Sequence, residues 1–122
     1  CPHCHGVGYL REEVPVGRVP VALLHTPGHT PGSQCLLVNG HLLSGDTLFI
    51  RACGRCDLPG GDPRLLHESL SKTLRALDDE TVLCPGHHYA EVPTSRMGEE
   101  KRANPFLSAP TLQDFLHLVG AG

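Results

Sequence analysis

Residues 25 to 33 read His25-Thr26-Pro27-Gly28-His29-Thr30-Pro31-Gly32-Ser33, and this loop rich in glycine and proline organises the segments around it. Residues 19 to 25 are β-branched or aliphatic for most of their length, which predicts a strand that ends where the loop begins. Residues 34 to 38 predict a second, buried strand directly after it. His29 is therefore displayed on a rigid loop at the end of a strand, where functional side chains are often found.

Further strands and helices follow along the chain. The pattern predicts a hairpin through Asn39-Gly40 to a strand at 41–44, a loop or short strand at 47–51, a helix at 63–77 capped by Asp62, a strand at 81–84 and a helix from about 111. Leucines at every third or fourth position give the helix at 63–77 one apolar face, and His67 is expected to be solvated. Strands that alternate with helices indicate a layered α/β fold.

The composition limits the possible functions. With 122 residues the chain has the length of one domain, and its longest apolar runs are too short to span a membrane. A formal charge of -3 and an aromatic content of 4% without tryptophan argue against nucleic acid as a partner. Six cysteines without an export signal favour reduced thiols and a cytoplasmic location.

Three potential metal ligands follow predicted strands. His29 lies in the loop quoted above, Asp46 comes after the strand at 41–44, and His87 comes after the strand at 81–84 and Pro85-Gly86. Two imidazoles and one carboxylate suit zinc or non-haem iron. We therefore expect these side chains to lie together at one edge of the sheet, although each alone could simply end a turn.

The three motifs together are more specific than any one of them. Residues 25–33, Ser-Gly-Asp-Thr-Leu-Phe at 44–49 and Pro-Gly-His-His-Tyr at 85–89 resemble, in order and spacing, the metallo-β-lactamase-fold superfamily. The loop at 53–61 and Glu-Glu-Lys-Arg-Ala-Asn-Pro at 99–105 are similar to its glyoxalase II-like and persulfide-dioxygenase-like branch. The resemblance implies an αββα sandwich, of which residues 14–122 form only the C-terminal half and residues 1–13 are a linker or truncated edge.

The resemblance also implies roles for individual residues. His29 and His87 are expected to bind metal, and Asp46 is expected to be the catalytic carboxylate that binds one metal or bridges two. Arg55, Asp57 and Tyr89 are candidates for contacts with the substrate or for support of the ligands, while an ion pair between Arg55 and Asp57 is an equally good interpretation.

The chain departs from the family in one respect. The family's His-x-His-x-Asp-His ligand motif has no counterpart, since His3-Cys4-His5 is followed by Val7 and Gly8 where Asp and His are expected. We therefore expect the chain to be part of a longer sequence and to be inactive by itself. A separate possibility is a structural zinc site formed by two CxxC pairs, Cys1/Cys4 and Cys53/Cys56.

Three functions remain open. The leading hypothesis is a glyoxalase II-like hydrolase in which one or two zinc ions activate water for attack on a small-molecule thiol ester. The first alternative is an Fe(II)-dependent persulfide (sulfur) dioxygenase. The second is an inactive fragment or a non-catalytic zinc-binding module. No nucleic acid or membrane partner is expected, and a homodimer is compatible with the sequence but not required by it.

Overall fold

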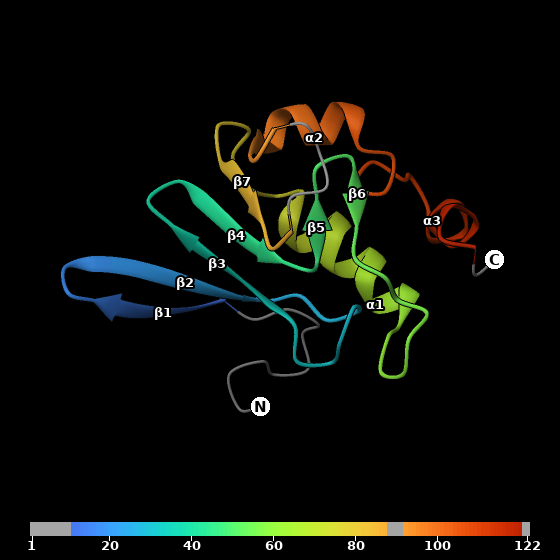
Figure 1. Cartoon of the computed structure of the whole chain (residues 1–122), viewed down its shortest axis with the longest axis horizontal. Helices are drawn as coiled ribbons and strands as arrows, with labels where there is room; N and C mark the ends of the chain where they lie inside the picture. Colours follow the sequence, from blue (N-terminus) through green and yellow to red (C-terminus); the bar gives the residue numbers. More distant parts are fainter. Residues whose placement is uncertain (1–10, 88–91, 121–122) are drawn as a thin grey trace.

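The computed structural model describes residues 11–87 and 92–120, and a six-stranded mixed sheet is its largest feature (Figure 1). In spatial order the strands are β1 (Arg11–Val16), β2 (Val19–His25), β3 (Gln34–Val38), β4 (His41–Gly45), β7 (Val82–Pro85) and β8 (Ser95–Arg96). All neighbours are antiparallel except β4 and β7, which are parallel. The strands predicted at 19–25 and 34–38 are confirmed, and the other two are displaced by about one residue at their ends.

The edge strand β1 was not predicted. Residues 11 to 13, which we had assigned to a linker or truncated edge, pair with β2, as in the cross-strand pair Glu12 and Leu23. Pro15 lies opposite Pro20, at a point where β2 has not yet begun to pair with β3. Proline is tolerated there because no further strand requires its missing N–H group. The domain boundary at residue 14 remains a prediction, and residues 1–10 lie outside the described part of the chain.

The first helix begins where the sequence predicts. The Asp62 side chain accepts hydrogen bonds from the backbone N–H groups of Arg64 and Leu65, and α1 (Pro63–Glu68) starts with proline. It continues as the π-helix η1 (Ser69–Leu74), so the helix predicted to reach residue 77 is shorter and partly of another type. In an α-helix, each residue is offset by about 40° around the helix axis from the residue four positions before it. The wider turns of a π-helix reduce this offset.

Two short helices complete the fold. Thr111 caps α3 (Leu112–Leu118) by accepting the Asp114 N–H group, which confirms the second predicted helix. α2 (Met97–Ala103) was not predicted. Its buried side includes the charged residue Glu100, so the apolar spacing that signals a helix is absent.

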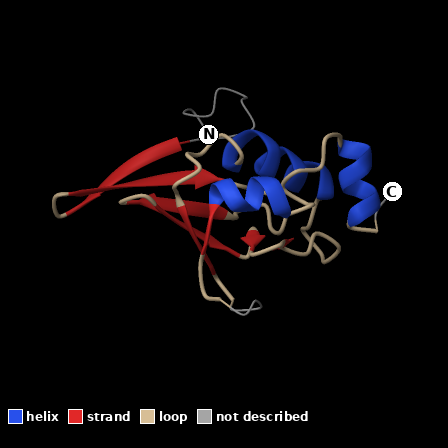
Figure 2. Ribbon diagram, turned by 90° about the horizontal axis from the view of Figure 1, so that it is seen from above, coloured by secondary structure: helices blue, strands red, loops and turns tan. Residues whose placement is uncertain are grey.

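The helices gather on one face of the sheet (Figure 2). Between the two layers lies one cluster of buried apolar side chains, with these members: Leu24, Cys35, Leu42, Leu48, Cys56, Leu66, Leu70, Leu74, Leu83, Met97, Leu107, Ala109 and Phe115. On the opposite face the cross-strand row Leu23, Leu36, Leu43 and Cys84 is only half-buried or exposed. One sheet and one helical layer are what half of an αββα sandwich would contain. No helix among the described residues is long and apolar enough to cross a bilayer.

Candidate metal centre

Three strands deliver the predicted ligands to the same edge of the sheet. β4 and β7 are parallel, so Asp46 and His87 leave their strands in the same direction. β2 and β4 are each antiparallel to β3, and β2 therefore points the same way as β4. The loop after β2 carries His29 to that edge. The direction of the strands explains why residues far apart in sequence meet.

Asp46 lies between the two imidazoles. Its Oδ2 atom is 3.6 Å from His29 Nε2, and its Oδ1 atom is 2.8 Å from His87 Nδ1. The side chains of His29, Asp46 and His87 are 23%, 39% and 51% exposed, so a cation can reach all three from solvent. Each oxygen faces a different ring. A carboxylate placed in this way can bind two cations, one through each oxygen, or bind a single cation.

A backbone carbonyl sets the orientation of the His29 ring. His29 Nδ1 lies 2.7 Å from the carbonyl oxygen of Arg55. Because a carbonyl oxygen can only accept, Nδ1 carries a proton, and in the neutral form of the ring the Nε2 lone pair faces Asp46. Histidines that bind metal are commonly fixed by such a bond from their other nitrogen. The lone pair and the carboxylate are both acceptors, so a cation between them would satisfy both.

The loop that carries His29 is docked on α1. Gly28 has φ +139°, and a Cβ atom there would lie 2.3 Å from Leu66 Cα. The Gly28 carbonyl accepts the Asp62 N–H group at 2.7 Å, and the Ser69 hydroxyl donates to the Pro27 carbonyl at 2.7 Å. Only glycine allows the loop to approach the helix this closely. The helical layer therefore determines where His29 lies.

Two other glycines surround Asp46. A Cβ atom on Gly54 would lie 1.8 Å from the Asp46 carbonyl oxygen and 3.3 Å from His29 Nδ1. A Cβ atom on Gly86 would lie 2.8 Å from the Gly45 carbonyl oxygen and 3.1 Å from Asp46 Oδ1. The backbone before His87 and the backbone after Cys53 thus pack directly against the residue that carries the central carboxylate.

The three side chains open into a cavity of about 350 Å³. Phe49, Ala52 and Cys53 form its apolar wall, and Arg55 lies at its margin. The Phe49 ring centroid is 5.9 Å from that of His87, with the ring planes inclined by 53°. A polar cluster beside an apolar wall is typical of a site for a small molecule.

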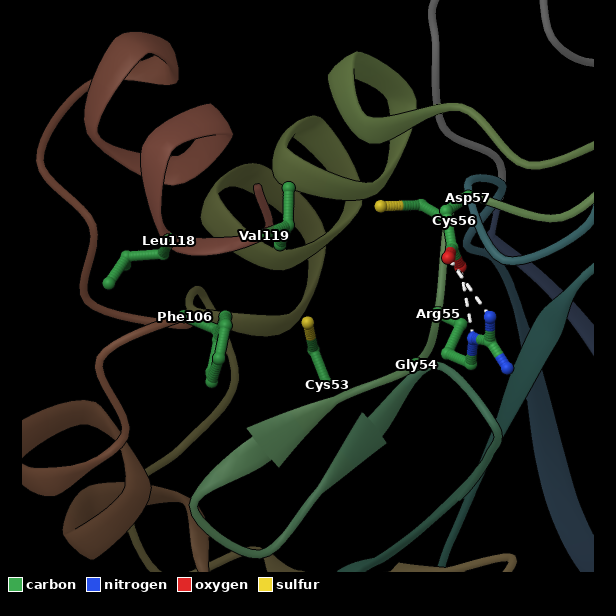
Figure 3. A pocket seen from close by; sticks show the side chains of 8 residues that line it. All are labelled: Cys53, Gly54, Arg55, Cys56, Asp57, Phe106, Leu118 and Val119. Atoms are coloured by element: carbon green, nitrogen blue, oxygen red, sulfur yellow. Dashed lines mark hydrogen bonds and ion pairs between the residues drawn. The ribbon is translucent and has the colours of Figure 1, made fainter. Parts of the chain in front are cut away.

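A second pocket of about 250 Å³ lies beside β6 (Ala52–Cys53), which pairs with β5 (Leu48–Phe49) (Figure 3). Figure 3 shows the Cys53 and Cys56 side chains directed towards the space in front of Leu118 and Val119. Burial, with a smaller contribution from Cys56, raises the pKa of Cys53 to about 12. Burial also raises the pKa of Cys56. Both groups are therefore protonated thiols at neutral pH.

Arg55 and Asp57 form an ion pair. Arg55 Nε and Nη2 donate to the two Asp57 carboxylate oxygens at 3.0 and 2.9 Å. This hydrogen bond lowers the pKa of Asp57. The pair is exposed, and a role for either side chain in binding substrate remains a prediction. Arg55 contributes to the site through its backbone carbonyl oxygen, which accepts the hydrogen bond from His29. No sequence signal could identify this carbonyl.

Several sequence predictions fall beyond the described part of the chain. Tyr89 lies there, as do Cys1 and Cys4, so a Cys₄ site is neither supported nor contradicted. The four described cysteines, Cys35, Cys53, Cys56 and Cys84, are free thiols. Within residues 11–87 and 92–120, no three His, Cys, Asp or Glu side chains surround a common point at which a metal ion could bind. The donors instead stand in a row with Asp46 in the middle.

The chain is similar to known proteins over most of its length. The model of the Metallo-beta-lactamase superfamily matches residues 3–87. A hydroxyacylglutathione hydrolase from Anaeromyxobacter dehalogenans is 46% identical over 80 residues, covering 66% of this chain and 31% of that protein. The mitochondrial persulfide dioxygenase ETHE1 of Homo sapiens is 31% identical over 111 residues, covering 89% of this chain and 43% of that protein.

A solved structure matches the fold as well. The crystal structure of ETHE1 from Myxococcus xanthus superposes with a TM-score of 0.84 and 37% identity, covering 89% of this chain and 48% of that one. The chain spans less than half the length of each of these three proteins. A family match over most of the chain, together with the same fold in a solved relative, means that this chain belongs to the metallo-beta-lactamase superfamily.

Proposed function

We propose that this chain supplies His29, Asp46 and His87 to the metal centre of a hydrolase that cleaves small-molecule thiol esters. The observation that carries the proposal is the position of Asp46, whose two carboxylate oxygens face two different imidazoles. The hydroxyacylglutathione hydrolase that is 46% identical supports a thiol ester as the substrate class.

The donor set fits a divalent metal. His29 Nε2, the Asp46 carboxylate and a ring nitrogen of His87 would hold one or two zinc ions, and nitrogen and oxygen donors of this kind are common zinc ligands. Once bound, such a metal lowers the pKa of water towards neutrality and polarises a carbonyl group. A catalytic zinc has three protein ligands around it. Because these three side chains stand in a row rather than around one point, each ion would need further ligands.

The residues of this chain would perform the remaining tasks. The hydrogen bond to the Arg55 carbonyl keeps His29 Nε2 available as a donor. Asp46 balances the charge of the cations and offers its oxygens as hydrogen-bond acceptors for the attacking water. Phe49, Ala52 and Cys53 give the acyl group of the substrate an apolar wall to pack against.

A second candidate is an Fe(II)-dependent persulfide dioxygenase. One observation favours it: the human persulfide dioxygenase aligns over 89% of this chain, whereas the hydrolase aligns over 66%. In that case His29 and Asp46 would bind a single iron. His87 would not bind the iron itself but would contact the residues around it. We prefer the hydrolase because His87 lies with His29 and Asp46 at one edge of the sheet, so that two imidazoles and one carboxylate are available to metal ions.

The test is metal content, measured by elemental analysis before and after single substitutions. His87→Ala in a hydrolase with two ions should remove about one metal equivalent and most of the activity of the whole protein. In the dioxygenase one iron should remain bound at full stoichiometry, and that result would make us abandon the hydrolase. His117→Ala is the matched control, because His117 is an exposed histidine on α3. Loss of all metal in Asp46→Ala is expected in both cases.

Two further outcomes bear on the proposal. We expect the 122-residue chain alone to show little turnover of a thiol ester, because the His-x-His-x-Asp-His ligands are not in it. No metal uptake at all, with or without these substitutions, would instead favour an inactive fragment. A cytoplasmic location and a homodimer are also proposals, which fractionation and light scattering would test.

A further inference from the structure

Glu100 is a fully buried carboxylate outside the candidate metal centre. Its Oε1 atom accepts the Arg51 backbone N–H group at 2.7 Å and the Asn104 side-chain amide at 3.2 Å. Its Oε2 atom accepts the Ser95 hydroxyl at 2.7 Å and the Arg51 guanidinium. A buried charge must be paired to be tolerated, and Glu100 has four donors from three residues.

Asn104, four residues later and directly after the end of α2, holds the same part of the chain. Its Nδ2 group donates to the carbonyl oxygens of Phe49 at 3.2 Å and Ala52 at 3.1 Å. Its Oδ1 atom accepts the backbone N–H group of Phe106 at 3.0 Å. Glu100 and Asn104 together therefore fasten both strands of the β5–β6 hairpin to α2.

The hairpin needs such support. Each of its strands has two residues, and a pairing this short contributes little stability of its own. Arg51, in its turn, has φ +61°, a left-handed conformation that is unfavourable for a residue other than glycine. The bonds from Glu100 to the Arg51 backbone and side chain hold this conformation in place.

The hairpin forms one wall of the candidate metal centre. Phe49, Ala52 and Cys53 line its cavity, and the Phe49 ring packs against the His87 ring. The next residue, Gly54, packs against the Asp46 backbone. A displacement of the hairpin would therefore move the wall and the ring contact of His87 together.

We propose that Glu100 and Asn104 are positioning residues for the metal centre, acting through the β5–β6 hairpin and Phe49 on the orientation of His87. The effect on metal binding rests on the proposed function, whereas the effect on His87 does not. A buried ion pair is often no more stabilising than apolar residues of the same volume. A carboxylate with four donors does, however, fix the hairpin in one position, which an apolar contact would not.

The experiment compares Glu100→Gln with Asp79→Asn in the full chain. Asp79 accepts a hydrogen bond from Lys101 at 2.7 Å and so anchors α2 without touching the hairpin. Three quantities are measured for each variant: the NMR signals of the His87 ring, the Kd for Zn²⁺ and the melting temperature. Glu100→Gln should shift the His87 signals and raise the Kd by about 10- to 100-fold. Asp79→Asn should lower the melting temperature and leave the other two quantities unchanged.

A second variant covers the case in which Glu100→Gln does not fold. Ser95→Ala removes one of the four donors to Glu100 and leaves the other three, so the His87 signals should shift while the chain stays folded. His87 signals that are unchanged in the folded variants would overturn the inference, as would equal effects of Glu100→Gln and Asp79→Asn on Kd. Absence of bound metal from the whole protein would contradict the proposed function alone, because the His87 signals would still decide this inference.

Discussion

Gly28→Ala should be one of the most destabilising single substitutions in the chain. The new Cβ atom would lie 2.3 Å from Leu66 Cα and 2.4 Å from Leu66 N, both of which are backbone atoms that cannot rotate away. The φ angle of +139° adds strain of about 1–3 kcal/mol, and overpacking adds about 1–3 kcal/mol. The sum of about 2–6 kcal/mol is a large part of the 5–15 kcal/mol that stabilises a typical domain.

The assay is urea unfolding followed by circular dichroism, with two glycine controls that separate the two contributions. Gly17 has φ +63° and open space around it, so Gly17→Ala should cost only the strain, about 1–2 kcal/mol. Gly32 has neither feature, so Gly32→Ala should be neutral. A loss for Gly28→Ala no larger than that for Gly17→Ala would refute the claim that close contact with α1 fixes the His29 loop.

Three further substitutions test other contacts. The pKa of Cys53 is raised from 9.0 to about 12, so its contribution to stability is present below pH 9 and is lost between pH 9 and 12. Cys53→Ala should flatten that alkaline loss in unfolding curves measured across the window. Asp62→Ala should lower the free energy of unfolding by about 1 kcal/mol by removing the cap of α1. Gly86→Ala should weaken Zn²⁺ binding in a calorimetric titration, because its Cβ atom would lie 3.1 Å from Asp46 Oδ1.

The fold was predictable where glycine and proline mark the ends of strands. The strands at 19–25 and 34–38 have the predicted bounds because the Pro/Gly loop between them ends the first and precedes the second, and an Asn-Gly turn ends the second. α2 was missed because its inner face carries Glu100, and a buried charge has no place in an apolar pattern. The change from α1 to η1 was missed because hydrogen-bond register, as in the bond from Arg75 N to Leu70 O, leaves no trace in residue type.

The candidate site was predictable in its side chains but not in its supports. Strand ends followed by Gly or Pro identify His29, Asp46 and His87, since the direction of the strands then places them at one edge. The Arg55 carbonyl that orients His29 could not be identified, because every residue has a carbonyl. The expectation that His67 is solvated was wrong. Its Nε2 atom is buried without a hydrogen-bond partner among the described residues, because α3 packs over α1.

The three candidate ligands depend on three different parts of the core. His29 depends on α1 through Gly28, Asp46 follows the central strand β4, and His87 depends on the β5–β6 hairpin and thus on α2. A cation that binds all three would stabilise the packing of these parts against one another, by about 2.7 kcal/mol when its concentration is 100 times its Kd. The linkage also acts in the other direction. Loosening either helix would weaken metal binding without altering a single ligand, so the stability of the helical layer is itself a determinant of metal affinity.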